Sequence, residues 1–128
     1  MVEFLTIDDV MELHAGQIAT YGGSDGLRSL DLLQSAIAQP QAMFSGVFLH
    51  TDIFQMAAAY LFHLVQNHPF IDGNKRIGLE AGLVFLQMNG YSIETEDVFL
   101  VELILGVAQG KIEKPEIAEF FRTHAVAS

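Results

Sequence analysis

The sequence predicts an all-α protein, a small single-domain helical bundle over residues 1–128 with one short hairpin or flap. Three observations lead to this prediction. Apolar residues recur at the spacing of a helix face along most of the chain. Glycine and proline residues interrupt that pattern at intervals typical of turns between helices. The chain has 128 residues, 51% hydrophobic and 17% charged, a composition typical of one compact domain.

Two helices are expected in the N-terminal third of the chain. Thr6 is a typical helix start because two aspartates follow it closely, and the apolar repeat then continues to Tyr21, where Gly22-Gly23 ends it. Ser29 can accept a hydrogen bond in the first turn of a second, shorter helix that Pro40 ends. The segment from 43 to 49 has aromatic and β-branched residues around a Ser-Gly turn, which indicates the hairpin or flap.

A central pair of helices follows. The first is expected to start at Thr51 or Asp52 and to stop at Pro69, because the residue before a proline is pushed out of the α region. The second begins near Gly73 and ends at Asn89-Gly90. Both are apolar on nearly every side, which indicates helices enclosed by others.

Two further helices are expected at 96–107 and 115–124, and the second of these is amphipathic. The acidic stretch Glu94, Glu96 and Asp97 is interpreted as a solvent-facing cap of the first one. With no repeat and no linker rich in proline or serine, nothing marks a second domain.

Composition excludes several classes of protein. The formal charge of −10 would repel nucleic acid over most of the surface, so no nucleic-acid partner is expected. The chain has no cysteine, which excludes disulfides and thiolate metal sites. Its apolar runs are too short to span a bilayer, so no membrane partner is expected. The first residues lack the basic start and apolar run of an export signal, which favours a cytoplasmic location.

The nine residues from His68 to Arg76 stand at the junction of the two central helices. A purely structural interpretation makes Asp72 an N-cap, Gly73 a turn residue and His68 a polar helix end. It does not account for Lys75 and Arg76, because cations in a first helical turn face the positive end of the helix dipole and cost about 0.3 to 1 kcal/mol each.

A functional interpretation accounts for both cations. Free backbone N–H groups, the asparagine donor of Asn74 and the cations of Lys75 and Arg76 are the equipment for binding a polyphosphate. Asp72 beside a phosphate suits Mg²⁺, which takes one or two carboxylates plus phosphate oxygens. His68 is mostly neutral at cytoplasmic pH and can take the proton of an attacking hydroxyl, so it is the candidate general base.

The other histidines are poorer candidates. His14 and His63 lie among apolar residues of helices, where a hydrogen-bonded core or boundary histidine is the commoner explanation. His50 and His124 have no carboxylate or histidine at a metal-like spacing, so a zinc site is not expected.

The junction resembles the signature H-x-F-x-D-G/A-N-x-R of the Fic and death-on-curing (Doc) proteins, and the match is complete. The resemblance extends to Tyr21-Gly22-Gly23, Gly26-Leu27-Arg28 and the run from Leu32 to Ile37, which are similar to the N-terminal half of Doc-type chains. It implies a small all-α bundle that uses ATP or another nucleoside triphosphate together with Mg²⁺.

The resemblance also implies a role for each residue of the signature. His68 would be the base, Asp72 the Mg²⁺ ligand and Arg76 a phosphate contact. Gly73 and Asn74 would form part of the anion-binding turn. In the Doc branch, which shares the Asn-Lys-Arg sequence, Lys75 would help to hold the phosphates.

Two departures from the larger Fic branch bear on the reaction. Members that transfer AMP usually have glycine at the position of Lys75 and a second arginine at that of Leu79. The Doc branch instead implies a kinase that transfers the terminal phosphate to a threonine of elongation factor Tu, and we favour this reaction. AMP transfer and a non-catalytic binding module on the same scaffold remain the alternatives. Glu80 has no assigned role.

The resemblance implies one further partner. The family's inhibitory helix, a Ser or Thr followed four residues later by Glu and then Gly or Asn, is not evident in this sequence. Control would then come from a separate small antitoxin that inserts a helix near the site, as in the Doc branch. The flap at 43–49 would hold a target segment by adding a strand, or would only cover the core.

Overall fold

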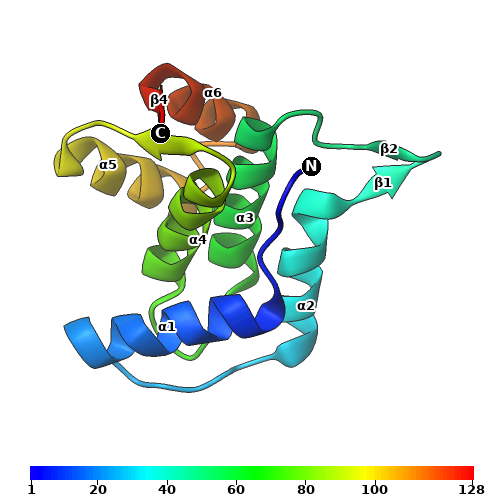
Figure 1. Ribbon diagram of the computed structural model, residues 1–128. Helices are drawn as coiled ribbons and strands as arrows, with labels where there is room; N and C mark the ends of the chain where they lie inside the picture. Colours follow the sequence, from blue (N-terminus) through cyan, green and yellow to red (C-terminus); the bar gives the residue numbers. More distant parts are fainter.

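The computed structural model describes all residues, 1–128, and confirms a small helical domain with a short hairpin. Six helices make up most of the chain (Figure 1). They are α1 (Ile7–Tyr21), α2 (Leu30–Ala38), α3 (Ile53–Asn67), α4 (Asn74–Met88), α5 (Asp97–Ala108) and α6 (Lys114–His124). A short 3-10 turn, η1 (Gln39–Gln41), follows α2, and its Pro40 is buried.

The centre of the fold is the pair α3 and α4, with the other helices arranged around it (Figure 1). Gly78 and Gly82 lie one turn apart on the face of α4 that meets α3. A Cβ at Gly78 would lie 2.7 Å from Cγ2 of Val65, and one at Gly82 would lie 3.3 Å from the carbonyl oxygen of Ala57. These glycines therefore let the two backbones approach closely. The junction at residues 68–73 connects these two closely packed helices.

Three predicted helix starts, at Thr6, Ser29 and Asp52, are confirmed by their caps, whereas Glu96 precedes α5 without the expected side-chain cap hydrogen bond. Thr6 and Asp9 exchange hydrogen bonds in a capping box at the start of α1. Ser29 accepts from the N–H of Leu32, and Asp52 accepts from the N–H of Gln55. Side-chain oxygens thus satisfy backbone donors that the helix itself leaves free.

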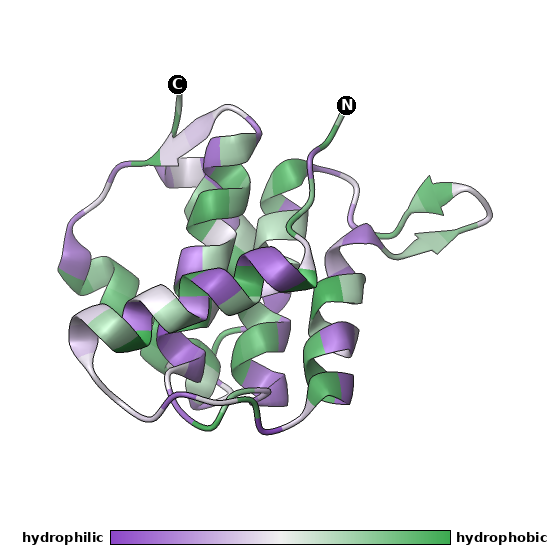
Figure 2. Cartoon of the chain, turned by 60° about the horizontal axis from the view of Figure 1, so that its bottom comes forward, coloured by the Kyte–Doolittle hydropathy of each residue, from purple (hydrophilic) through white to green (hydrophobic).

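The expected hairpin is present and projects from the body of the molecule (Figure 2). It pairs β1 (Met43–Phe44) with β2 (Val47–Phe48) in antiparallel fashion. Met43, Phe44 and Val47 are exposed, and Phe48 alone packs against the core, beside Phe4.

A second small sheet was not expected from the sequence. Strands β3 (Tyr91–Ile93) and β4 (Ala125–Ala127) pair antiparallel, with Ser92 opposite Val126. Each is three residues long and they are more than thirty residues apart, so no local pattern announces them. None of the helices combines the length and apolar character needed to cross a bilayer.

Candidate active site

The signature residues gather around a cleft of about 470 Å³ between the start of α4 and the apolar face of α5. All six candidate residues line it: His68, Asp72, Gly73, Asn74, Lys75 and Arg76. The opposite wall is apolar and includes Val101, Ile104 and Leu105 of α5. The fold therefore places a polar, cationic edge against a hydrophobic wall.

His68 ends α3 in the left-handed region, with φ 53 and ψ 52. Its Nδ1 lies 3.2 Å from the carbonyl oxygen of Val65. Because a carbonyl oxygen can only accept, this hydrogen bond requires the proton on Nδ1 and leaves Nε2 as the basic nitrogen. An exposed imidazole in this tautomer is suited to take a proton from a hydroxyl at Nε2.

Asp72 lies exposed at the mouth of the cleft, and its carboxylate is held by two backbone donors. The N–H of Ser24 donates to Oδ2 at 3.2 Å, and that of Gly73 donates to Oδ1 at 2.8 Å. These two hydrogen bonds hold the pKa of Asp72 below its ordinary value, so the group is ionised at neutral pH. One lone pair on each oxygen is used, and the others are free for a cation.

The side chain of Asn74 corrects one expectation. It was expected to donate to a bound anion, but it is buried beneath the loop and forms two hydrogen bonds with the backbone of Phe70. Its Oδ1 accepts from the N–H and its Nδ2 donates to the carbonyl oxygen, both at 2.9 Å. The amide therefore shapes the loop, and only the backbone N–H of Asn74 is left for a ligand.

The first turn of α4 has free backbone donors. Asp72 does not cap this helix, because the N-cap residue is Gly73, at φ 81, and no side chain accepts from the first turn. The N–H groups of Asn74, Lys75 and Arg76 have no acceptor within the chain. Three such donors at the positive end of a helix dipole attract an anion.

Lys75 and Arg76 are exposed and form no ion pair within the chain. The Arg76 guanidinium lies over the ring of Tyr21, with Cζ 4.3 Å from the ring centroid. This cation–π contact directs Arg76 toward α1, at the edge of the cleft. Because no carboxylate of the chain pairs with Lys75 or Arg76, both positive charges are available to an anionic ligand.

Residues outside the signature brace it. The interpretation of His14 as a hydrogen-bonded core histidine is confirmed, but its contact with the signature was not expected, and Gly23 and Arg28 had been noted only as part of the family resemblance. His14 is buried, stacks on Phe70 with centroids 3.8 Å apart, and donates from Nε2 to the carbonyl oxygen of Asp72 at 2.8 Å. A Cβ at Gly23 would lie 2.7 Å from Oδ2 of Asp72, so only glycine allows this approach. Arg28 donates to the carbonyl oxygens at the end of α3. The resemblance of Gly22-Gly23 and Gly26-Leu27-Arg28 to Doc-type chains was the sequence signal that could have pointed to Gly23 and Arg28.

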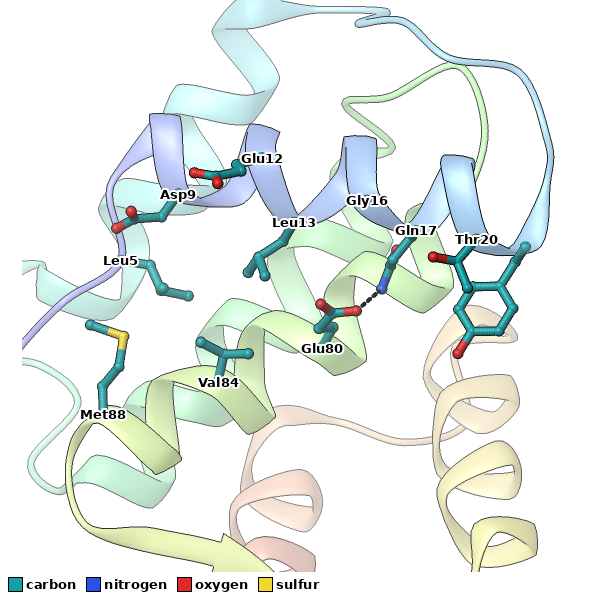
Figure 3. A pocket seen from close by; sticks show the side chains of 11 residues that line it. Leu5, Asp9, Glu12, Leu13, Gly16, Gln17, Thr20, Glu80, Val84 and Met88 are labelled. Atoms are coloured by element: carbon teal, nitrogen blue, oxygen red, sulfur yellow. Dashed lines mark hydrogen bonds between the residues drawn. The ribbon is translucent and has the colours of Figure 1, made fainter.

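A second hollow, of about 650 Å³, lies between α1 and α4 (Figure 3). Leu5, Leu13, Val84 and Met88 line it with apolar side chains, and Asp9, Glu12 and Glu80 add negative charge. Nε2 of the buried Gln17 donates to a carboxylate oxygen of Glu80 and to the carbonyl oxygen of Arg76. Glu80 thus connects α4 to α1 beside the signature.

The remaining histidines lie away from the cleft. The Nζ of Lys114 is 3.1 Å from Nε2 of His63 and 3.4 Å from Nε2 of His50. Burial, together with this ammonium group, lowers the pKa of His63 to about 4 and also lowers that of His50. No group of three or more potential ligands is arranged for a metal ion.

The hairpin and His68 lie at opposite ends of α3 (Figure 1). The helix has 15 residues, so its ends are about 22 Å apart. A target strand paired with the hairpin would have to extend over that distance to present a hydroxyl to Nε2. The position of the hairpin therefore does not favour the expected role in holding a target segment.

Comparisons with known proteins agree with this arrangement. Residues 4–86 match the model of the Fic/DOC family. The chain is 41% identical over 96 residues to "Toxin Doc" of Mycolicibacterium smegmatis, an alignment that covers 75% of this chain and 72% of the relative. It is 31% identical over 115 residues to "Protein kinase doc" of Escherichia phage P1, covering 90% of each. The chain belongs to the Fic/Doc family, in its death-on-curing branch.

Proposed function

We propose that this protein is a Doc-like toxin that acts as a protein kinase. It transfers the terminal phosphate of ATP, or of another nucleoside triphosphate, to a hydroxyl of a target protein such as elongation factor Tu. The observation that carries the proposal is the first turn of α4, where three unpaired N–H groups and two cations adjoin a base and a carboxylate. The name of the phage P1 relative, a protein kinase, supports it.

The chain's own groups account for the steps of such a transfer. Nε2 of His68 takes the proton of the target hydroxyl as its oxygen forms a bond to the terminal phosphorus. The bond from that phosphorus to the bridging oxygen breaks, and the nucleoside diphosphate leaves. The N–H groups of Asn74 to Arg76, with the side chains of Lys75 and Arg76, bind the phosphates and stabilise the charge of the transition state.

Asp72 is the residue that would hold Mg²⁺. Its carboxylate is ionised, lies at the mouth of the cleft and keeps free lone pairs, which fits an ion that takes one or two protein carboxylates plus phosphate oxygens. When bound, the ion neutralises phosphate charge and orients the phosphates. Ser24 and Gly73 fix the direction of the carboxylate through their N–H groups.

AMP transfer is the second candidate reaction, since it uses the same signature. Two positions favour the kinase. Lys75 adds a long cationic side chain at the edge of the cleft, where it can hold a terminal phosphate. Leu79 lines the cleft with an apolar side chain and offers no charge to a nucleotide. A binding module without activity would have no use for an exposed basic imidazole.

The test is incubation with Mg²⁺, a cell extract and ATP labelled at either the γ- or the α-phosphate, beside a His68→Ala control. The kinase is expected to move γ-label onto a protein, and the control is expected to lose it. Transfer of α-label would instead establish AMP transfer. With no label from either position, the chain would be a binding module.

The groove between α1 and α4 is the surface that we propose for an antitoxin. Its apolar floor and acidic rim fit an amphipathic helix with basic residues, and it adjoins Arg76 through Tyr21 and Gln17. Glu12→Lys should weaken co-purification with an antitoxin that binds this chain. The matched control Glu102→Lys, at an exposed position of α5 outside the groove, should not. Equal binding of both variants would exclude the groove.

A further inference from the structure

The end of α3 carries the candidate base and needs partners from elsewhere in the chain. The last carbonyl groups of a helix have no intrahelical donor, and the last turn of α3 has no basic residue to complement the dipole. His68 adds strain, because its φ of 53 is unusual for a residue with a side chain. Something outside the helix must hold this residue in place.

Arg28 supplies those contacts from the loop before α2. Its Nε donates to the carbonyl oxygen of His68 at 2.6 Å, and its Nη2 donates to that of Asn67 at 2.8 Å. The planar guanidinium thus spans two successive carbonyls and places a positive charge at the negative end of α3. Both oxygens belong to the turn that determines where the imidazole points.

The backbone around Arg28 attaches the two segments independently of its side chain. The N–H groups of Arg28 and Ser29 both donate to the carbonyl oxygen of Pro69, and that of Ile71 donates to the carbonyl oxygen of Gly26. Arg28 itself is exposed and lies outside the hydrophobic core. Loss of the guanidinium should therefore change the geometry at His68 without unfolding the loop.

We propose that Arg28 is a positioning residue for His68. By fixing the carbonyl oxygens of Asn67 and His68, it holds the strained turn in which Nδ1 reaches the carbonyl oxygen of Val65 and Nε2 stays the basic nitrogen. The proposal rests on the proposed function, in which Nε2 of His68 takes a proton. It concerns the orientation and tautomer of the base, and Arg28 does not line the cleft.

The test combines kinetics with a spectroscopic signal. Arg28→Ala should lower kcat about 10- to 100-fold, the effect of a misplaced catalytic group, with little change in the KM for ATP. In protein labelled with ¹⁵N-histidine, the ring signals of His68, assigned with His68→Ala, should move from the Nδ1–H form toward a mixture of tautomers. Arg28→Lys keeps the charge and one donor group. Relative to Arg28→Ala, it should restore part of kcat and part of the Nδ1–H signal of His68.

The matched control is Arg122→Ala, which removes another exposed arginine with two hydrogen-bonded partners, Asp52 and Glu119, away from the cleft. It should change neither kcat nor the His68 signals. A folded Arg28→Ala variant with wild-type kcat and an unchanged Nδ1–H signal would overturn the proposal. If the wild type transfers no phosphate, the proposed function fails, and the tautomer signal alone decides whether Arg28 positions His68. If Arg28→Ala does not fold, Arg28→Met, which keeps the length of the side chain without its charge or donors, is measured in its place with the same criteria.

Discussion

Asn74→Ala separates a role in shaping the loop from a role in binding nucleotide. The amide satisfies the N–H and the carbonyl oxygen of Phe70, which is 2% exposed. Each buried backbone group left without a partner costs about 1 to 3 kcal/mol. Water reaches the adjacent cleft and can satisfy part of this need, so we expect a loss of about 2 to 4 kcal/mol of stability. For a domain of this size the melting temperature would fall by about 10 °C.

The assay is thermal and urea unfolding of the ligand-free protein. Asn74→Asp keeps an acceptor for the N–H of Phe70 but puts a second carboxylate oxygen against the carbonyl oxygen of Phe70 in a buried site, so at neutral pH it should be destabilised at least as much as Asn74→Ala. Asn67→Ala is the control, since it removes a single hydrogen bond to the carbonyl oxygen of Leu32 and should cost about 1 kcal/mol. The reasoning is refuted if Asn74→Ala costs no more than Asn67→Ala, because the amide would then be free to serve a ligand.

Gly23→Ala should slow phosphate transfer about tenfold or more, because its Cβ would displace the carboxylate of Asp72. Gly46→Ala, also at positive φ but with no atom within 4 Å, should not, and equal rates would contradict this. Because the folded pKa of His63 is about 4, below its ordinary 6.5, only the unfolded chain binds its proton between those values, and stability falls as the pH falls through that window. His63→Gln keeps an acceptor for Lys114 but does not titrate. When the pH is lowered from 6.5 to 4, its free energy of unfolding in urea should therefore fall by about 1 to 2 kcal/mol less than that of the wild type, after discounting for solvent screening. Parallel pH profiles would contradict this.

The helices were predictable because their signals are local. Thr6, Ser29 and Asp52 are caps whose partners lie three residues away, and the apolar repeat between caps fixes which faces are buried. The pairing of β3 with β4 depends on tertiary contact between Tyr91–Ile93 and the last residues of the chain. Short strands of this kind carry too little sequence for a pattern to form.

The functional groups of the site could also be predicted from neighbouring residues, but their orientation could not. Nine consecutive residues supply the proposed base, the carboxylate and the cations. Whether Asn74 faces a ligand or the loop depends on where Phe70 is buried, and the direction of Asp72 depends on the N–H of Ser24, 48 residues away. The contact between Asn74 and Phe70 spans only four residues, but that between Ser24 and Asp72 arises when the loop after α1 packs against the junction, and spacing within the signature cannot report it.

The family match covers one side of the cleft, the signature loop, and does not cover the other side, α5. Residues 4–86 include His14, Gly23, Arg28 and the signature, so the loop that carries the proposed base and the residues that brace it form one unit within the matched region. The apolar wall contributed by α5 lies outside that region. For the proposed transfer in this cleft, we expect substitutions in α5 to change selectivity for nucleotide or target, and substitutions in the braced loop to change the rate of transfer itself.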